Sequence, residues 1–391
     1  MTRILLLLPT RTYRAEVFLA AAKRLGVDVV AASEIAGALE AGAPSSFDFG
    51  DPESAAALIA QKGPFAAVLG VDDASVQAAA RISRMLGLRA NPPEAVDASR
   101  NKKIMREKFL AGGVRVPRFA DAAERCPVPF PCVVKATTLS ASRGVIRADG
   151  ANEYSAAVTR VRALLQREGE PEAPIIVEAF LPGPEVALDG LLAGGKLRAL
   201  ALFDKPETPD GPFFPETLFV TPSRLPPAVQ EEIRAEAQRA SGALGLREGP
   251  IHAEFRVTPD GPVILELAAR TIGGRCSGAL RFGADASLEE LVLRNALGLD
   301  DALLPREDSA SGVCMINPDR PGIVERVDGL AEALAVEGIA EAVFPTRGSR
   351  ALEPLPEGGQ YAGFLFAKAD TPEAVETALK TARGKITVVL R

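Results

Sequence analysis

The first part of the chain, to about residue 91, alternates between apolar runs and segments with helical periodicity. Apolar runs cover residues 4–8, 27–32 and 65–71, and a helical pattern stands between the first two at 14–26. Strands that alternate with helices in this way predict a parallel sheet covered by helices. No G-x-G-x-x-G follows the first run and no G-x-x-x-x-G-K-[ST] occurs in the sequence, so both nucleotide-binding fingerprints are missing.

A proline pair at 92–93 separates this region from one predicted helix, which starts at about residue 94 and stops at Gly112-Gly113. The elements predicted after it are a strand-loop-strand unit (131–149), an amphipathic helix (153–169), a strand-rich segment (173–205), a helix (226–245), two β-rich runs around the turn 259–261, and a mixed tail from about residue 309 with a helix at 372–383. This order predicts a multidomain protein of the α/β and α+β classes.

Length and composition limit the functions that the chain can have. Its 391 residues, 47% of them hydrophobic, suffice for two or three domains with buried cores. A net charge of −6, without blocks of like charge, argues against nucleic-acid or membrane partners and favours small molecules. Because the apolar start is too short for a membrane span and lacks a cleavage site, we expect a cytoplasmic protein. Four cysteines without a C-x-x-C pair and a single histidine argue against a zinc site.

The predicted hairpin around residues 259–261 places two acidic side chains together. With a three-residue loop, Glu254 lies directly opposite Glu266, and His252 lies opposite Ala268. Directly opposed carboxylates repel each other, and Mg²⁺, which prefers oxygen ligands, would neutralise them. The alternative is a solvated sheet face. Side chains expected on the opposite, core-facing side are Ala253, Phe255, Val257, Leu265 and Leu267.

Lys135 ends an apolar β-run and precedes a loop of small and hydroxylated residues at 136–144. A compact ammonium group suits a phosphate, and the loop offers backbone N–H groups to phosphate oxygens. The alternative is an ordinary exposed hairpin whose lysine extends to solvent.

Five features in one order resemble the ATP-grasp enzymes. They are Lys102 with Arg106 at a helix start, Lys135 with its loop, VEAFLPGPE at 177–185, the Glu254/Glu266 pair, and Arg270. Their order over residues 96–300 carries the resemblance, since no single motif is specific. It implies an ATP-grasp fold with three parts: an N-terminal Rossmann-like parallel α/β domain (1–95), an ATP-grasp domain (96–305) and a C-terminal mixed α/β domain (306–391).

The resemblance also implies residue roles. Lys102 and Lys135 contact the ATP phosphates, and Glu254 and Glu266 hold Mg²⁺, or Mn²⁺ in its place. His252 reaches a phosphoryl oxygen, with a structural role as the alternative. The remaining implied nucleotide contacts are Ser140, Ser142, Arg143 and Gly144 in the covering loop, Glu178 and the backbone of Phe180 and Leu181 along the adenine, and Glu185 at the ribose hydroxyls.

Two departures from the family pattern refine the resemblance. Many members have asparagine where this chain has Ala268, so the number of metal ions stays open. The Q-V-E-H stretch of biotin carboxylases is also missing after Arg270, where the chain runs TIGGRCSGAL. The segment instead resembles the L-amino acid ligase branch, in which such an arginine binds the substrate carboxylate or its acyl phosphate. Arg275 and the N–H groups of Gly273-Gly274 would assist Arg270, with a surface position as the alternative for Arg275.

The sequence therefore predicts an ATP-dependent carboxylate-amine ligase that works through an acyl phosphate and releases ADP and phosphate. Lys205 and Glu216, in the proline-rich segment 202–226, are candidates for the acceptor pocket. Expected partners are a small carboxylate and an amine, amino acids among them, and a homodimer stays open. The alternatives are phosphorylation of a small acid or bicarbonate, as in carbamoyl-phosphate synthesis, and nucleotide binding without turnover.

Overall fold

A computed structural model describes residues 2–9, 14–34, 45–46, 48–53, 56–299, 304–346, 348 and 351–391. Its N-terminal part is a four-stranded parallel sheet of order β3-β2-β1-β4, as the alternating pattern predicts. Along β1, Ile4 and Leu6 pack into one core and Leu5 and Leu7 into another, which is why the strand is apolar throughout. The elements are β1 (Arg3–Leu7), α1 (Ala15–Arg24), β2 (Asp28–Ser33), β3 (Ser45–Ser46), α2 (Ala56–Lys62), β4 (Ala67–Gly70) and α3 (Asp73–Met85).

The single helix predicted from about residue 94 is wrong, because the structure has two helices there, α4 (Pro93–Arg100) and α5 (Lys102–Ala111). Asn101 between them is extended, and its side chain accepts hydrogen bonds from the backbone N–H groups of Lys103 and Ile104. Asparagine favours this capping position over a helix interior because its side chain replaces the missing backbone acceptor. The break puts Lys102 in the first turn of α5, where its side chain is buried.

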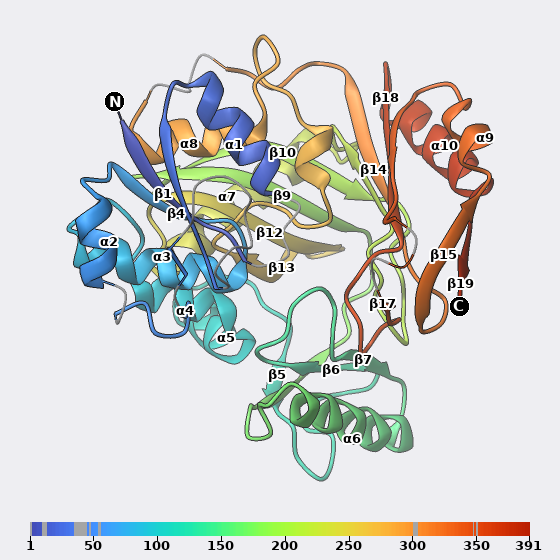
Figure 1. The fold of residues 1–391 in the computed structure, drawn as a ribbon. Coiled ribbons are helices and arrows are strands. Elements are labelled where there is room, and N and C mark those ends of the chain that lie inside the picture. Colours follow the sequence, from blue (N-terminus) through green and yellow to red (C-terminus); the bar gives the residue numbers. More distant parts are fainter. Residues whose placement is uncertain are drawn as a thin grey trace.

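A small sheet stands below the main body of the molecule with one helix on its outer face (Figure 1). Its order is β5-β8-β6-β7 and all its pairs are antiparallel. Lys135, on β6, pairs with Val145 on β7, so residues 137–144 form the connecting loop. The elements are β5 (Phe119–Asp121), β6 (Cys132–Ala136), β7 (Val145–Ala148), α6 (Ala151–Arg167) and β8 (Ile175–Ala179).

The largest sheet has eight antiparallel strands in the order β13-β12-β9-β10-β11-β14-β18-β16. It continues across the predicted boundary at 305/306, since β11 pairs with β14 over four residues. This continuity does not by itself test the predicted domain limits, which remain a prediction. Its elements and those between them are β9 (Glu185–Ala193), β10 (Lys196–Lys205), β11 (Leu218–Thr221), α7 (Pro227–Leu244), β12 (Gly249–Thr258), β13 (Gly261–Ala268), α8 (Leu288–Ala296), β14 (Ala310–Ile316), β16 (Ile339–Val343) and β18 (Gly363–Ala369), with a 3-10 turn at Cys276–Ala279.

A three-stranded sheet and two helices complete the C-terminal part. The sheet has the order β17-β15-β19, from β15 (Gly322–Asp328), β17 (Ala351–Leu352) and β19 (Thr387–Leu390). Helix α9 spans Leu330–Leu334, and α10 spans Pro372–Arg383, which confirms the helix predicted at 372–383. Among the described helices, none is long and apolar enough to cross a bilayer.

The hairpin of β12 and β13 confirms the predicted pairing of Glu254 with Glu266, although its turn differs from the prediction. Thr258 pairs with Gly261, so the loop has two residues, and a bulge at Leu265 shifts the register by one before Glu266. As a result Ile264, not Leu265, is fully buried in the core, and Leu265 lines a cavity. The predicted core position of Leu265 is therefore wrong.

Candidate active site

A cavity of about 1380 Å³ lies between the large sheet, the small sheet and the C-terminal strands. All the site residues predicted from the sequence line it except Arg143 and Gly144. Side chains from the N-terminal part reach the cavity as well, namely Arg14, Asp72 and Asp73. The three regions of the chain therefore meet at one site.

Glu178 joins two cations in the wall of the cavity. Its carboxylate lies 2.6 Å from Nε of Arg106 and 2.6 Å from Nζ of Lys135, and all three side chains are largely or fully buried. Burial alone would raise the pKa of Glu178, but Arg106 and Lys135 lower it to about 2. Burial also lowers the pKa of Lys135 below its usual range, an effect that Glu178 opposes. The structure thus holds Lys135 in place from β6, pointing its ammonium group into the cavity wall.

Lys102 reaches the same cavity from the start of α5. Its backbone N–H donates to the carbonyl of Thr137 at 2.9 Å, and its Nζ donates to the carbonyl of Leu139 at 2.7 Å. Nζ also lies 3.3 Å from Glu266. Lys102 therefore connects the loop 137–144 with the second acidic residue of the hairpin.

The loop 137–144 has an unusual backbone. Ala141 and Ser142 have φ angles of 57° and 58°, a conformation that costs residues with a Cβ roughly 1 kcal/mol or more. Such strain concentrates in segments that bind ligands. Ser140 and Ser142 line the cavity, whereas Arg143 and Gly144 contact a segment of the C-terminal part instead.

Phe180 directly follows β8, an inner strand of the small sheet. The guanidinium carbon of Arg147 is 4.2 Å from its ring centroid and that of Arg256 is 5.7 Å away. Its backbone N–H donates to Pro131 at 3.0 Å, so this donor is already used, while Leu181 follows as the next residue of the cavity wall.

Each of the two hairpin carboxylates has a cationic partner. Glu266 faces Lys102, and Glu254 accepts from His252 Nε2 at 3.2 Å and lies 3.9 Å from Lys205. Although burial would raise the pKa of Glu254, the Lys205 charge and His252 hold it well below its usual range. The repulsion between the opposed carboxylates is thus offset by protein cations, so a metal is not needed to explain their pairing.

His252 lies between two carboxylates. Its Nδ1 is 3.1 Å from Asp189 on the neighbouring strand β9, and its Nε2 is 3.2 Å from Glu254. Burial would lower the pKa of His252, but the hydrogen bonds to Asp189 and Glu254 raise it to about 9. The imidazole is therefore cationic at neutral pH, which adds positive charge beneath the hairpin carboxylates.

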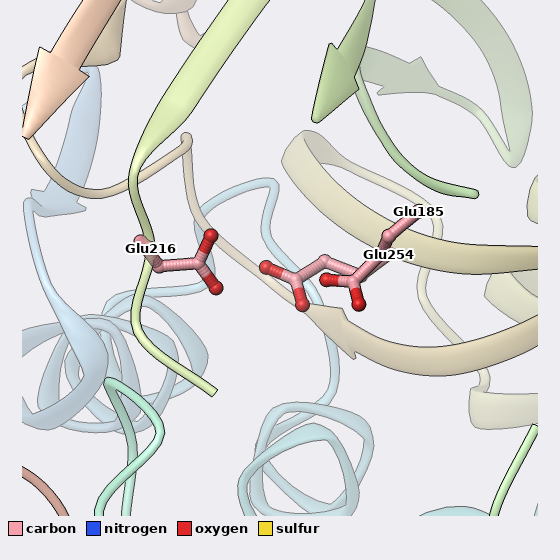
Figure 2. A group of neighbouring side chains, drawn as sticks. All are labelled: Glu185, Glu216 and Glu254. Atoms are coloured by element: carbon pink, nitrogen blue, oxygen red, sulfur yellow. The ribbon is translucent and has the colours of Figure 1, made fainter. Parts of the chain in front are cut away.

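Lys205 is the centre of a second charged group. The carboxylates of Glu185, Glu216 and Glu254 point toward one another and come within 4.8 Å of one another (Figure 2). Lys205 Nζ contacts Glu185 and lies 2.7 Å from Glu216. Despite burial, these carboxylates raise the pKa of Lys205 well above its usual value, while burial raises that of Glu216 to about 7. Arg256 also binds Glu185, at 2.9 Å, so both oxygens of this predicted ribose acceptor already have cationic partners.

Arg270 follows the hairpin and is fixed by the N-terminal part. Its Nε lies 2.6 Å from Asp73 at the start of α3, and Asp73 also pairs with Arg100 at 3.2 Å. Burial opposes ionisation, but Arg270 and Arg100 hold the pKa of Asp73 well below its usual range. The arginine is therefore held at the cavity by a permanently ionised carboxylate.

The segment after Arg270 is held from two sides. Arg14 donates to the carbonyl of Ile272 at 2.6 Å and contacts the hydroxyl of Thr271, while Asp189 accepts from the backbone N–H of Ile272 at 3.4 Å. Gly273, Gly274 and Arg275 then line the cavity. At Gly274, where φ is +57°, a Cβ atom would lie 2.5 Å from the terminal methyl of Met315, so another residue would strain the backbone and displace this side chain.

Charged residues of this site that were not expected from the sequence include Arg14, Asp73, Asp189 and Arg256. Two had detectable signals. Asp73 follows the carboxyl end of the buried parallel strand β4, where ligand sites of such sheets lie, and Asp189 interrupts the apolar run of β9. Arg14 and Arg256 had none, because their partners are distant in sequence.

Comparison with protein families identifies two parts of the chain. Residues 128–279 match the model described as ATP-grasp domain. Residues 315–391 match the model described as L-amino acid ligase C-terminal domain 2. The chain thus contains an ATP-grasp domain followed by a C-terminal domain of the L-amino acid ligase type, and the predicted superfamily and branch are confirmed.

Individual proteins that resemble the chain share only a modest sequence identity with it. The chain is 28% identical over 292 residues to alanine--anticapsin ligase of Bacillus subtilis, covering 66% of this chain and 61% of that protein. It is 26% identical to the uncharacterized protein y4rH of Sinorhizobium fredii, over 77% of this chain and 63% of that protein. The chain therefore spans about six tenths of the length of these relatives.

Among solved structures, an L-amino acid ligase from Bacillus licheniformis superposes with a TM-score of 0.80 at 24% identity. The alignment covers 100% of this chain and 99% of that one. The whole described fold, including the small sheet and the C-terminal part, is therefore an ATP-grasp fold, as predicted.

Proposed function

We propose that this protein is an ATP-dependent carboxylate-amine ligase that forms an amide or peptide bond through an acyl phosphate. The observation that carries the proposal is the meeting, in one cavity, of Lys102, Lys135, the opposed Glu254 and Glu266, and Arg270. The match to an ATP-grasp domain and to an L-amino acid ligase C-terminal domain supports it. The likeness to alanine--anticapsin ligase supports amino acids as substrates.

ATP would lie between the small and large sheets. Lys102 and Lys135 would neutralise its phosphates, with Ser140 and Ser142 on the loop above them. Glu178, Phe180 and Leu181 would lie along the adenine and Glu185 near the ribose. The two oxygens of Glu185 bind Lys205 and Arg256. These two cations would fix the orientation of the Glu185 carboxylate near the sugar.

The residues present fit a divalent metal of the Mg²⁺ or Mn²⁺ type. Glu254 and Glu266 are opposed on adjacent strands, face the cavity and offer carboxylate oxygens, which these cations prefer. When bound, the metal would supply positive charge to the phosphate oxygens. Lys102, next to Glu266, would add its charge at the same place.

In the proposed reaction, a substrate carboxylate oxygen attacks the terminal phosphorus of ATP, and the bond to ADP breaks. An amine nitrogen then attacks the acyl carbon, phosphate leaves with the bonding electron pair, and the proton that the nitrogen loses passes to the departing phosphate. Arg270, together with Arg275 and the N–H groups of Gly273-Gly274, would stabilise the negative charge that develops on the acyl phosphate. His252, as an imidazolium between Asp189 and Glu254, would add positive charge near the transferring phosphoryl group.

Lys205 and Glu216 are proposed for the acceptor pocket. Glu216, whose pKa is raised to about 7 mainly by burial, faces the cavity beside Phe214 and Phe219. A carboxylate at such a position suits the ammonium group of an amino acid. We propose the division into residues 1–95, 96–305 and 306–391 as the functional organisation around this site.

Hydroxylamine trapping tests the proposal. With MgATP and the correct acid from a panel of L-amino acids, hydroxylamine should intercept the acyl phosphate and give a hydroxamate, accompanied by ADP rather than AMP. Arg270→Ala should lower the hydroxamate yield at least tenfold and change the affinity for ATP much less, since its proposed partner is the acyl phosphate. Arg234→Ala, on the exposed face of α7, is the matched control. AMP as the product, or a yield indifferent to Arg270, would refute the mechanism.

A further inference from the structure

Arg143 and Gly144 were expected at the nucleotide, yet both contact the C-terminal part of the chain. The backbone N–H of Gly144 donates to the carbonyl of Pro356 at 2.9 Å, and Nε of Arg143 donates to the carbonyl of Glu357 at 2.8 Å. The loop that carries Ser140 and Ser142 is therefore hydrogen-bonded to residues more than 200 positions later in the chain.

The helix behind this loop contacts the same C-terminal segment. Arg160 on α6 forms two parallel hydrogen bonds to Glu357, at 2.6 and 2.8 Å, and Arg167 binds Glu353 at 2.8 Å. A bidentate arginine-carboxylate pair is the geometry in which a partly exposed ion pair stabilises measurably. The pairing lowers the pKa of Glu357 through the hydrogen bond from Arg160, so the carboxylate is ionised at neutral pH.

The backbone of the two segments is also close. A Cβ atom on Gly359 would lie 3.0 Å from Cβ of Ala141 and 3.1 Å from Cδ of Arg143, so the glycine lets the chains approach. Residues at both ends of the segment, Glu353 and Gly359, line the cavity. The segment thus touches the phosphate loop on one side and the substrate space on the other.

From these contacts we infer that residues 353–359 form a latch, with Glu357 as its positioning residue. The latch holds the loop 137–144 in the conformation in which Ser140 and Ser142 face the cavity. Glu357 touches no reacting atom in this scheme and acts through Arg160 and Arg143. The effect of the latch on ATP binding rests on the proposed function, whereas the contact between the latch and the loop does not.

The contact can be measured without turnover, by hydrogen-deuterium exchange of a peptide that contains the Gly144 amide. Glu357→Ala and Arg160→Met remove the ion pair from opposite sides, and each should speed exchange of this amide at least tenfold. The combined charge swap R160E/E357R should restore slow exchange. Asp328→Asn is the matched control. It breaks an exposed ion pair in the C-terminal part, in which Arg326 Nε lies 3.1 Å from the Asp328 carboxylate, and this pair does not contact the loop.

A kinetic measurement then tests positioning. Both single variants should raise KM for ATP about tenfold with a smaller change in kcat, and the charge swap should reverse the effect. Unchanged exchange in both variants would overturn the latch, and faster exchange with an unchanged KM for ATP would overturn its positioning role. Faster exchange in a protein that forms no ADP with any acid would uphold the latch and refute the proposed function.

Discussion

Replacing Glu178 by glutamine tests the charged cluster that fixes Lys135. The substitution keeps the shape of the side chain but leaves the buried cations Arg106 and Lys135 without their shared carboxylate. The shift of the Glu178 pKa from 4.5 to about 2 corresponds to about 3 kcal/mol of stabilisation at neutral pH. Loss of one partner from a buried ion pair costs about 3–5 kcal/mol, which agrees in magnitude.

The sign of the pH dependence follows from the lowered pKa. Stability from this group is complete above the unfolded value of 4.5 and is lost as pH falls through the folded value of about 2. The difference between wild type and E178Q should therefore be constant around neutral pH, from about pH 5.5. It should diminish under acidic conditions, and also at alkaline pH, where Lys135, whose pKa is lowered by burial and no longer supported by a carboxylate in E178Q, becomes neutral.

Native-state hydrogen exchange is a suitable assay, because it reports the local free energy of opening in a multidomain chain. Amides of β6 and β8 should exchange roughly 100-fold faster in E178Q at neutral pH, as about 3 kcal/mol requires. Asp121→Asn on β5 of the same sheet breaks the exposed Lys103–Asp121 pair and should change exchange less than about fivefold. Rates in E178Q that match those of this control would refute the electrostatic account of the cluster.

Two further predictions concern the phosphates and the metal. Lys135→Met should weaken ATP binding about 10- to 100-fold, the value of a lost charge-assisted hydrogen bond, with the fold intact by circular dichroism; calorimetry that finds normal ATP affinity would remove Lys135 from the nucleotide site. Glu254→Gln and Glu266→Gln should each abolish Mg²⁺-dependent ADP formation, measured by titration with MgCl₂, and an unchanged Mg²⁺ dependence in both would reduce the pair to a structural role. No gain of stability is expected in the metal-free variants, because Lys102 and His252 already face these carboxylates.

Local patterns predicted much of this architecture. The alternation along residues 3–70, the helix at 372–383 and the pairing of Glu254 with Glu266 depend on periodicity and neighbouring residues, and the structure has all three. The hairpin shows the limit of such reasoning. A two-residue turn and a bulge at Leu265 together give the register that a three-residue turn would have given. A pattern of alternating side chains cannot distinguish a longer turn from a shorter turn followed by a bulge, because both give the same register.

The contacts between segments that are distant in the chain could not be predicted from the sequence. Asp73 and Arg270 are 197 residues apart, and Arg143 and Glu357 are 214 apart. Neither pair has a local signature, since an arginine and a carboxylate occur throughout the chain and only the fold selects partners. The break at Asn101 was missed for a different reason. Helical periodicity continues on both sides of it, and capping by a single side chain interrupts the hydrogen bonds without changing the pattern.

The continuity of the eight-stranded sheet has a consequence for dissecting the protein. A fragment ending near residue 305 would lose β14, β18 and β16, and β11 would become an edge strand with unpaired backbone groups. Leu218, Val220 and Phe219, which are buried in the whole chain, would then border solvent. Exposed apolar edges of this kind recruit other strands and aggregate. A minimal nucleotide-binding unit is therefore better sought by replacing side chains in the intact protein than by deleting its C-terminal part.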